Sequence, residues 1–164
     1  MSERARELAD RLRALNDELL RDVEAASTAQ WEAPADVDGE TRTGGQLAWH
    51  VARGYFLVMS WICDVLMFGR LPQASVDFIH ADNAREAAAN PSPDRDLVAR
   101  ILRQRGEAMA LLIGSLTDAD LDRESENEMG NRRWRVEQLC GSASRHVSVH
   151  LAAFRSTRGD TPRA

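Results

Sequence analysis

The sequence predicts an all-α protein that folds as a four-helix bundle with a long crossover between helices 2 and 3. Apolar residues recur at spacings of three and four in four separate segments, each long enough to contribute to one shared core. Strand signals are weak, because the 164 residues include one Tyr and few β-branched runs. Hydrophobic residues make up 43% of the chain and charged residues 29%, which is the composition of an ordinary globular protein.

The first helix is predicted over residues 3–26. Its apolar stripe consists of Leu8, Leu12, Leu15, Leu19 and Val23. Asn16 falls on the opposite face, which we expect to be exposed to solvent. A loop follows, because Pro34 and the turn-forming residues 36–39 interrupt the helical pattern.

The second helix is predicted to begin after Thr41 or Thr43, because either hydroxyl can accept a hydrogen bond from an unpaired backbone N–H of the first turn. It runs to Phe68 and ends at Gly69, since glycine is favoured just beyond a helix C-terminus. Residues 70–92 form a long connection that holds one helical turn. A connection of this length allows the next helix to cross over the bundle.

The third helix is predicted to begin at Ser92, the N-cap, with Pro93 in the first helical position, where its missing N–H has no cost. It ends near Ser115. A turn at residues 117–121 and a polar loop then lead to the fourth helix, which we expect over residues 134–155.

The chain shows no internal repeat, so we expect one domain over residues 1–156 and a disordered tail over residues 157–164. A net charge of −5 argues against a nucleic-acid partner. No apolar run approaches the roughly 20 residues of a membrane span, and we expect no membrane partner. Two cysteines cannot form a disulfide framework, which favours the cytoplasm.

Three of the four histidines fall on predicted inner faces. His146 and His150 are one turn apart in the fourth helix and complete an apolar stripe that includes Leu151, while His50 lies beside Leu47 in the second helix. Burying the rings without partners would cost roughly 1–3 kcal/mol per group, and a shared divalent cation removes that cost. A metal-free bundle with hydrogen-bonded core histidines is the competing interpretation.

Three short motifs carry a family resemblance. They are Trp31, the segment 43–52 (Thr-Gly-Gly-Gln-Leu-Ala-Trp-His-Val-Ala) and the segment 145–151 (Arg-His-Val-Ser-Val-His-Leu). Their order, spread over the whole chain, resembles the DinB-like (YfiT-type) superfamily of four-helix-bundle metalloproteins. This resemblance implies a divalent metal, zinc or nickel, on His50, His146 and His150, and it implies a homodimer.

Within this superfamily, the mycothiol-dependent maleylpyruvate isomerases carry Glu at the position of His146, so this chain is more similar to the three-histidine branch. That branch implies a metal-dependent enzyme, either a hydrolase or an S-transferase of a low-molecular-weight thiol of the mycothiol, bacillithiol or glutathione type. A bound cation can activate either water or a thiol. No Asp or Glu lies one turn from the three histidines, which favours the thiol over base-assisted hydrolysis.

Three polar residues are candidates for binding a small-molecule substrate. Gln46 and Ser142 each precede a predicted ligand by four residues, and Arg53, three residues after His50, is suited to a substrate carboxylate. His80, in the long connection, is expected on the surface. A second class of function stays open, namely a non-catalytic bundle that binds a metal or ligand as a stress sensor.

Overall fold

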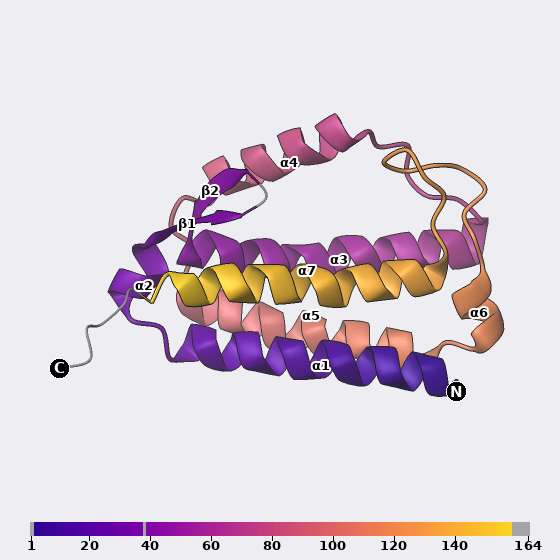
Figure 1. The fold of residues 1–164 in the computed structure, drawn as a ribbon, viewed down its shortest axis with the longest axis horizontal. Coiled ribbons are helices and arrows are strands. Elements are labelled where there is room, and N and C mark those ends of the chain that lie inside the picture. Colours follow the sequence, from indigo (N-terminus) through magenta and orange to yellow (C-terminus); the bar gives the residue numbers. More distant parts are fainter. Residues whose placement is uncertain (1, 38, 159–164) are drawn as a thin grey trace.

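The computed structural model describes residues 2–37 and 39–158, and it confirms the predicted four-helix bundle (Figure 1). The bundle helices are α1 (Glu3–Glu24), α3 (Gly44–Phe68), α5 (Arg95–Ser115) and α7 (Val136–Ser156). The shorter elements are α2 (Thr28–Glu32), β1 (Pro34–Val37), β2 (Glu40–Thr43), α4 (Val76–Ala89) and α6 (Asp118–Asp122). The four predicted helical segments coincide with the bundle helices to within one turn.

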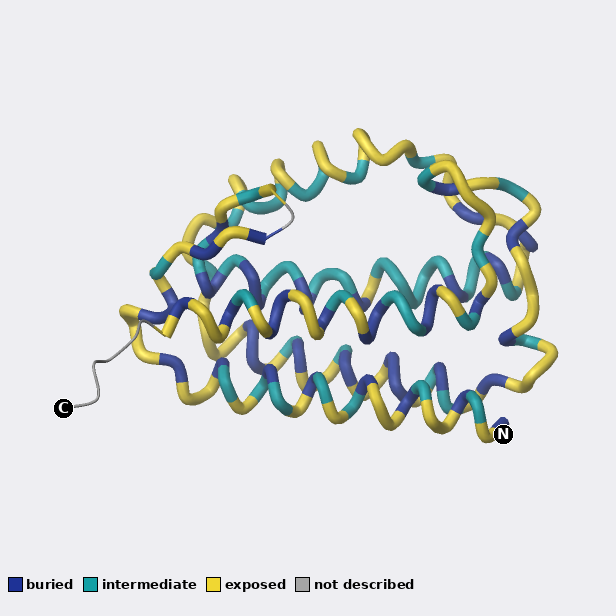
Figure 2. The backbone as a smooth tube through the Cα atoms, viewed as in Figure 1, coloured by how far each residue is buried: buried dark blue, intermediate teal, exposed yellow. Residues whose placement is uncertain are grey.

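The four long helices share one core. Helix α1 packs against α5 and α7, and α3 packs against the same two helices. Figure 2 shows that the buried positions of these helices turn toward one another, while the exposed positions lie outside. The largest fully buried side chains include Phe154, Leu12, Leu19, Leu47, Ile62 and Leu102. Helices α3 and α7, which carry the three histidines, are therefore direct neighbours.

The crossover between the second and third bundle helices is formed by α4. In Figure 1, α4 returns along the length of the bundle after α3 ends, so that α5 starts near the end where α3 began and runs in the same direction. None of the α4 residues is buried, and α4 contacts α3 only sparsely. The crossover is thus a helix laid across the outside of the bundle.

Two predictions about this connection were wrong. Residues 76–89 form a 14-residue helix where one turn was expected, because the Ser75 hydroxyl accepts a hydrogen bond from the Phe78 N–H and caps a full helix. Helix α5 is capped by Asp94 and not by Ser92, since the Asp94 carboxylate accepts the Leu97 N–H at 2.7 Å.

The loop before α3 contains an antiparallel hairpin of β1 and β2, which the sequence reading did not anticipate. Asp38-Gly39 is a two-residue hairpin signature, and Gly39 has the positive φ of 79° that such turns require. The alternate β1 residues Ala35 and Val37 are buried and pack against Leu47 of α3. This small apolar cluster fixes the hairpin against the start of α3.

The ends of α3 are set by the predicted residues. Of the two predicted caps, Thr43 is the one used: its hydroxyl accepts the Gln46 N–H, and the Gln46 side chain accepts the Thr43 N–H in return. At the other end, Gly69 adopts a left-handed conformation with φ 72° and donates to Val65. These ends place His50 in the second turn.

The last described residues remain attached to the bundle. Thr157 is buried, and the Arg158 guanidinium donates to the Asp22 carboxylate at 2.5 Å. The other residues of the predicted disordered tail, 159–164, lie outside the described residues.

Asn16 is not on a solvated face as predicted. Its side chain is 4% exposed, and its amide oxygen accepts the hydroxyl of Tyr55 at 2.9 Å. Gly106 of α5 leaves room for this amide, because a Cβ at Gly106 would lie 2.5 Å from the Asn16 side chain. A buried polar pair therefore lies where α1, α3 and α5 meet.

Among the described helices, α3 alone is long and apolar enough to cross a membrane, judged by length and composition only. Its most apolar 18-residue window is 28% buried within the bundle. Helix α3 nevertheless packs on both α5 and α7, and a core helix passes the same test. The expectation of no membrane partner stays a prediction.

We predict that Gly106→Ala destabilises the protein, because the added methyl group would displace the Asn16 amide from Tyr55. The expected loss is about 1–3 kcal/mol in the free energy of unfolding, measured by urea denaturation. Gly141→Ala, in the interior of α7 with open space at its Cβ, is the matched control and should stabilise by up to about 1 kcal/mol. Equal effects of the two substitutions would contradict this account.

Candidate metal centre

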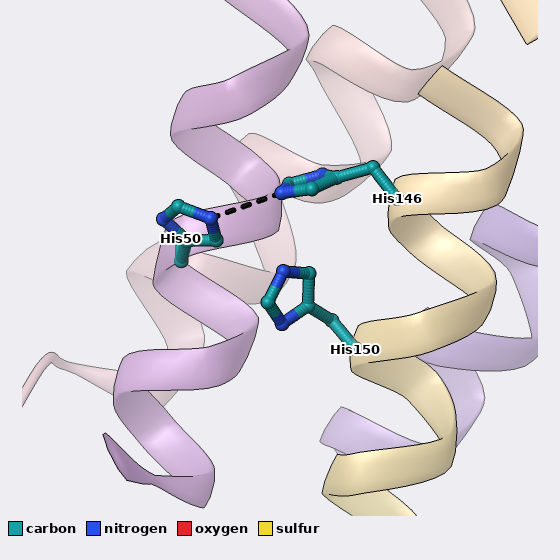
Figure 3. A group of neighbouring side chains, drawn as sticks. All are labelled: His50, His146 and His150. Atoms are coloured by element: carbon teal, nitrogen blue, oxygen red, sulfur yellow. Dashed lines mark hydrogen bonds between the residues drawn. The ribbon is translucent and has the colours of Figure 1, made fainter. Parts of the chain in front are cut away.

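Three histidine side chains meet between α3 and α7. His50 comes from the second turn of α3, while His146 and His150 lie one turn apart near the middle of α7. Figure 3 shows all three rings pointing toward one another across the contact between the two helices. The apolar stripes that pack these helices together thus also bring the three rings together.

The rings are close enough to share one cation. One nitrogen from each of the three rings lies within 4.8 Å of the others. The ring centroids of His146 and His150 are 4.4 Å apart, and each is 4.8 Å from that of His50. The Nε2 atoms of His50 and His146 are 2.9 Å apart. For this contact to be a hydrogen bond, one ring must donate and the other must accept.

Burial keeps the rings of His50 and His150 neutral. Desolvation, followed by the neighbouring rings His146 and His150, lowers the pKa of His50 to about 2. Desolvation, followed by the positive charge of Arg42, lowers the pKa of His150 to about 4. At neutral pH each of these two rings therefore offers an unprotonated nitrogen to a Lewis acid.

The three residues fit a divalent cation. Imidazole nitrogens bound to Zn²⁺ at 2.0–2.1 Å in a tetrahedral site stand roughly 3.3 Å apart, a value between the 2.9 Å of the His50–His146 pair and the 4.8 Å within which all three nitrogens lie. The Nδ1 atom of His150 is also buried without a hydrogen-bond partner among the described residues. A core that satisfied its histidines by hydrogen bonds would not leave this atom unpaired. The donor set and its spacing suit a divalent cation.

The cluster opens into a cavity of about 540 Å³ between α3, α4 and α7. Leu57, Val58 and Trp61 of α3 form an apolar wall, and Ile79 of α4 and Val149 of α7 also line the space. None of the described residues that line it is an Asp or a Glu. The cavity therefore pairs a polar histidine end with an apolar wall and offers no carboxylate as a general base.

The three candidate substrate-binding residues have different positions. Arg53 and Ser142 line the cavity, whereas Gln46 does not. The Gln46 amide caps α3 and donates to the Ala87 carbonyl oxygen of α4 at 3.0 Å. The Ser142 hydroxyl donates to the Leu139 carbonyl oxygen within α7. Gln46 therefore joins α3 to α4 and does not face the cavity.

Arg53 holds α4 beside the cavity. Its guanidinium forms an ion pair with Asp82 and lies 3.7 Å from a Glu86 carboxylate oxygen. Glu86 also accepts the indole N–H of Trp49 at 3.1 Å. Because α4 buries no side chain, these polar contacts and those of Gln46 supply most of its attachment to α3.

His80 lies outside the cluster, as the sequence predicted. Its side chain is 58% exposed, and its Nδ1 atom is 3.9 Å from a Glu40 carboxylate oxygen. Glu40 in turn pairs with Arg42, whose side chain is buried.

Arg42 is the residue near the site that sequence reasoning missed. It lies on β2, and its charge contributes to lowering the pKa of both His50 and His150. Its only sequence signal is the alternation of the hairpin, which places Arg42 on the inward face beside Ala35. The charge of this buried arginine adds to the desolvation that keeps His50 and His150 unprotonated.

Comparison with known proteins supports the fold. No protein-family model and no curated protein matches the sequence. The structure is similar to that of YfiT from Bacillus subtilis, described as a probable metal-dependent hydrolase with an unusual four-helix bundle topology; the TM-score is 0.77 at 16% identity over 96% of this chain and 87% of that chain. It is also similar to an uncharacterized protein from Clostridium difficile 630, with a TM-score of 0.70 at 13% identity over 95% and 96% of the two chains. The YfiT-like fold inferred from the motifs is therefore confirmed.

We predict that the wild-type protein binds one equivalent of Zn²⁺ or Ni²⁺, and that His50→Ala, His146→Ala or His150→Ala weakens binding by about a hundredfold or more. Losing even an outer hydrogen-bond partner of a metal ligand costs 10–100-fold, and losing a ligand should cost at least as much. Titration calorimetry of the untagged protein measures this. His80→Ala is the control and should bind as the wild type does; equal loss from His80→Ala would contradict the assignment.

We predict that Asp82→Asn combined with Glu86→Gln loosens α4 without unfolding the bundle. Removal of the two half-buried partners of Arg53 should lower the free energy of opening α4 by about 1 kcal/mol. Amide hydrogen exchange in α4 should therefore become roughly fivefold faster. Arg85→Gln, which breaks only an exposed ion pair to Asp82, is the control. Unchanged exchange in the double variant would show that other contacts hold α4.

Proposed function

We propose that this protein is a metal-dependent enzyme in which His50, His146 and His150 hold one divalent cation, zinc or nickel. The observation that carries the proposal is the meeting of three histidine rings from two helices in the lining of one cavity. A small-molecule substrate, a cytoplasmic location and a homodimer belong to the same proposal.

When bound, such a cation supplies Lewis-acid chemistry, which lowers the pKa of a coordinated water or thiol. Three neutral ligands leave its full positive charge for this task. The chain itself provides the apolar wall of Leu57, Val58 and Trp61, which would orient the apolar part of a substrate and exclude water. Arg53 would keep α4 in place over that substrate.

Two reactions follow from this arrangement, each favoured by one observation. The lack of a carboxylate among the described lining residues favours transfer of a low-molecular-weight thiol, because coordination alone deprotonates a thiol. In that transfer, a bond forms between sulfur and an electrophilic carbon while the leaving group departs and the thiol proton passes to solvent. The similarity to YfiT, described as a probable metal-dependent hydrolase, favours attack by water.

We predict that the zinc- or nickel-loaded protein accelerates one of two test reactions. These are conjugation of a low-molecular-weight thiol to a bimane electrophile and hydrolysis of an aryl ester without thiol. Removing the metal with EDTA, or replacing His150 with Ala, should reduce turnover to background, and His80→Ala should retain it.

Conjugation alone would support the transferase, and thiol-independent ester cleavage alone would support the hydrolase. If the protein binds one metal ion tightly but turns over none of a panel of thiols, electrophiles and esters, the enzyme proposal is overturned and the non-catalytic sensor is favoured.

A further inference from the structure

A second groove lies beside the histidine cavity and is lined by three arginines. It has a volume of about 420 Å³ and is bordered by Arg11 of α1, Arg132 of the loop before α7, and Arg145 of α7. The groove and the cavity share Ser142, Arg145 and Val149, so they adjoin along the same stretch of α7. A ligand long enough to follow α7 would occupy both.

The charge of this surface is opposite to that of the chain. The sequence has a net charge of −5, yet no Asp or Glu occurs among the described residues that line either the groove or the cavity. Arg53 adds a further cation on the cavity side. Arginines contributed by three separate elements to one groove raise the local concentration of anions there.

The three guanidinium groups are available to a ligand. None of Arg11, Arg132 and Arg145 forms an ion pair with a carboxylate of the described residues, in contrast to Arg4, Arg13 and Arg155 on other surfaces. Arg132 is held by stacking, since its Cζ atom lies 3.4 Å from the ring centroid of Trp134. Stacking fixes the plane of a guanidinium while leaving its N–H groups free to donate to a carboxylate or phosphate.

The polar groups between the arginines suit the same ligand. Gln138 and Ser148 line the groove beside Arg145, and each can donate a hydrogen bond to an anionic oxygen. Val149 and the apolar wall of the cavity continue from this polar end toward the histidines.

We propose that the groove formed by Arg11, Arg132 and Arg145 binds the anionic group, a carboxylate or a phosphate, of a substrate whose apolar body extends into the histidine cavity. The substrate class is therefore an amphipathic organic anion. The part that concerns the reactive end rests on the proposed metal-dependent function, whereas binding of the anionic group does not require a metal.

The test is an NMR titration of ¹⁵N-labelled full-length protein with phenyl phosphate, phenylacetate, inorganic phosphate and neutral benzyl alcohol. We expect the amides of Gly141, Ser142 and Ser148 to shift with the organic anions but not with benzyl alcohol. Whichever of phenyl phosphate and phenylacetate binds more tightly identifies the preferred anionic group. Weaker binding of inorganic phosphate shows the contribution of the apolar body.

Two double variants with the same change in charge separate the groove from general electrostatics. Arg132→Ala with Arg145→Ala should weaken binding roughly tenfold or more, as expected for loss of charged hydrogen bonds. Arg70→Ala with Arg100→Ala, two exposed arginines elsewhere, should change it by less than about twofold. Arg11→Ala with Arg145→Ala keeps Arg132 stacked on Trp134 and should also weaken binding, which shows that the loss follows from the groove's charge and not from a disturbed loop.

The same titration of EDTA-treated protein distinguishes this inference from the proposed function. Persistence of anion binding without metal supports the groove even if no turnover is ever found. Equal affinity of the groove and control variants, or binding that needs the metal and ignores the arginines, would overturn the inference.

Discussion

The meeting of three imidazole rings at one helix contact, with His150 buried and His50 and His146 half-buried, is the constraint on which the rest of the site depends. Each imidazole ring has two nitrogens to satisfy, and among the described residues the Nε2 atoms of His50 and His146 are paired with each other at 2.9 Å. A buried nitrogen of His150 has no hydrogen-bond partner among the described residues. A shared cation accounts for the meeting of the three rings and for the unpaired nitrogen of His150 together.

The crossover helix α4 forms one side of the cavity beside the histidines. Here α4 lies outside the core, held by polar contacts to Arg53, Trp49 and Gln46, and it covers the opening between α3 and α7 without filling it. The crossover element therefore encloses a space beside the histidines.

Helical periodicity was sufficient to predict the bundle and the inward direction of the histidines, because both follow from which residues share a stripe. It failed where a tertiary contact decides. Asn16 is polar and looks solvated in its helix, but Tyr55 and Gly106 lie on other helices and bury it. The hairpin was missed although Asp38-Gly39 is its local signal, and with it Arg42, whose proximity to His50 depends on how the hairpin packs. Gln46 shows the opposite error: its spacing of four residues from His50 predicted substrate binding, but its side chain caps α3 and contacts α4.

The most direct measurement is a crystal structure of the untagged protein grown with equimolar zinc, with anomalous data collected on both sides of the zinc absorption edge. The account predicts one strong anomalous peak bonded to a ring nitrogen of each of His50, His146 and His150, at roughly 2.0–2.1 Å. A structure with no anomalous peak between these rings, or with zinc bound elsewhere while the rings hydrogen-bond among themselves, would contradict it.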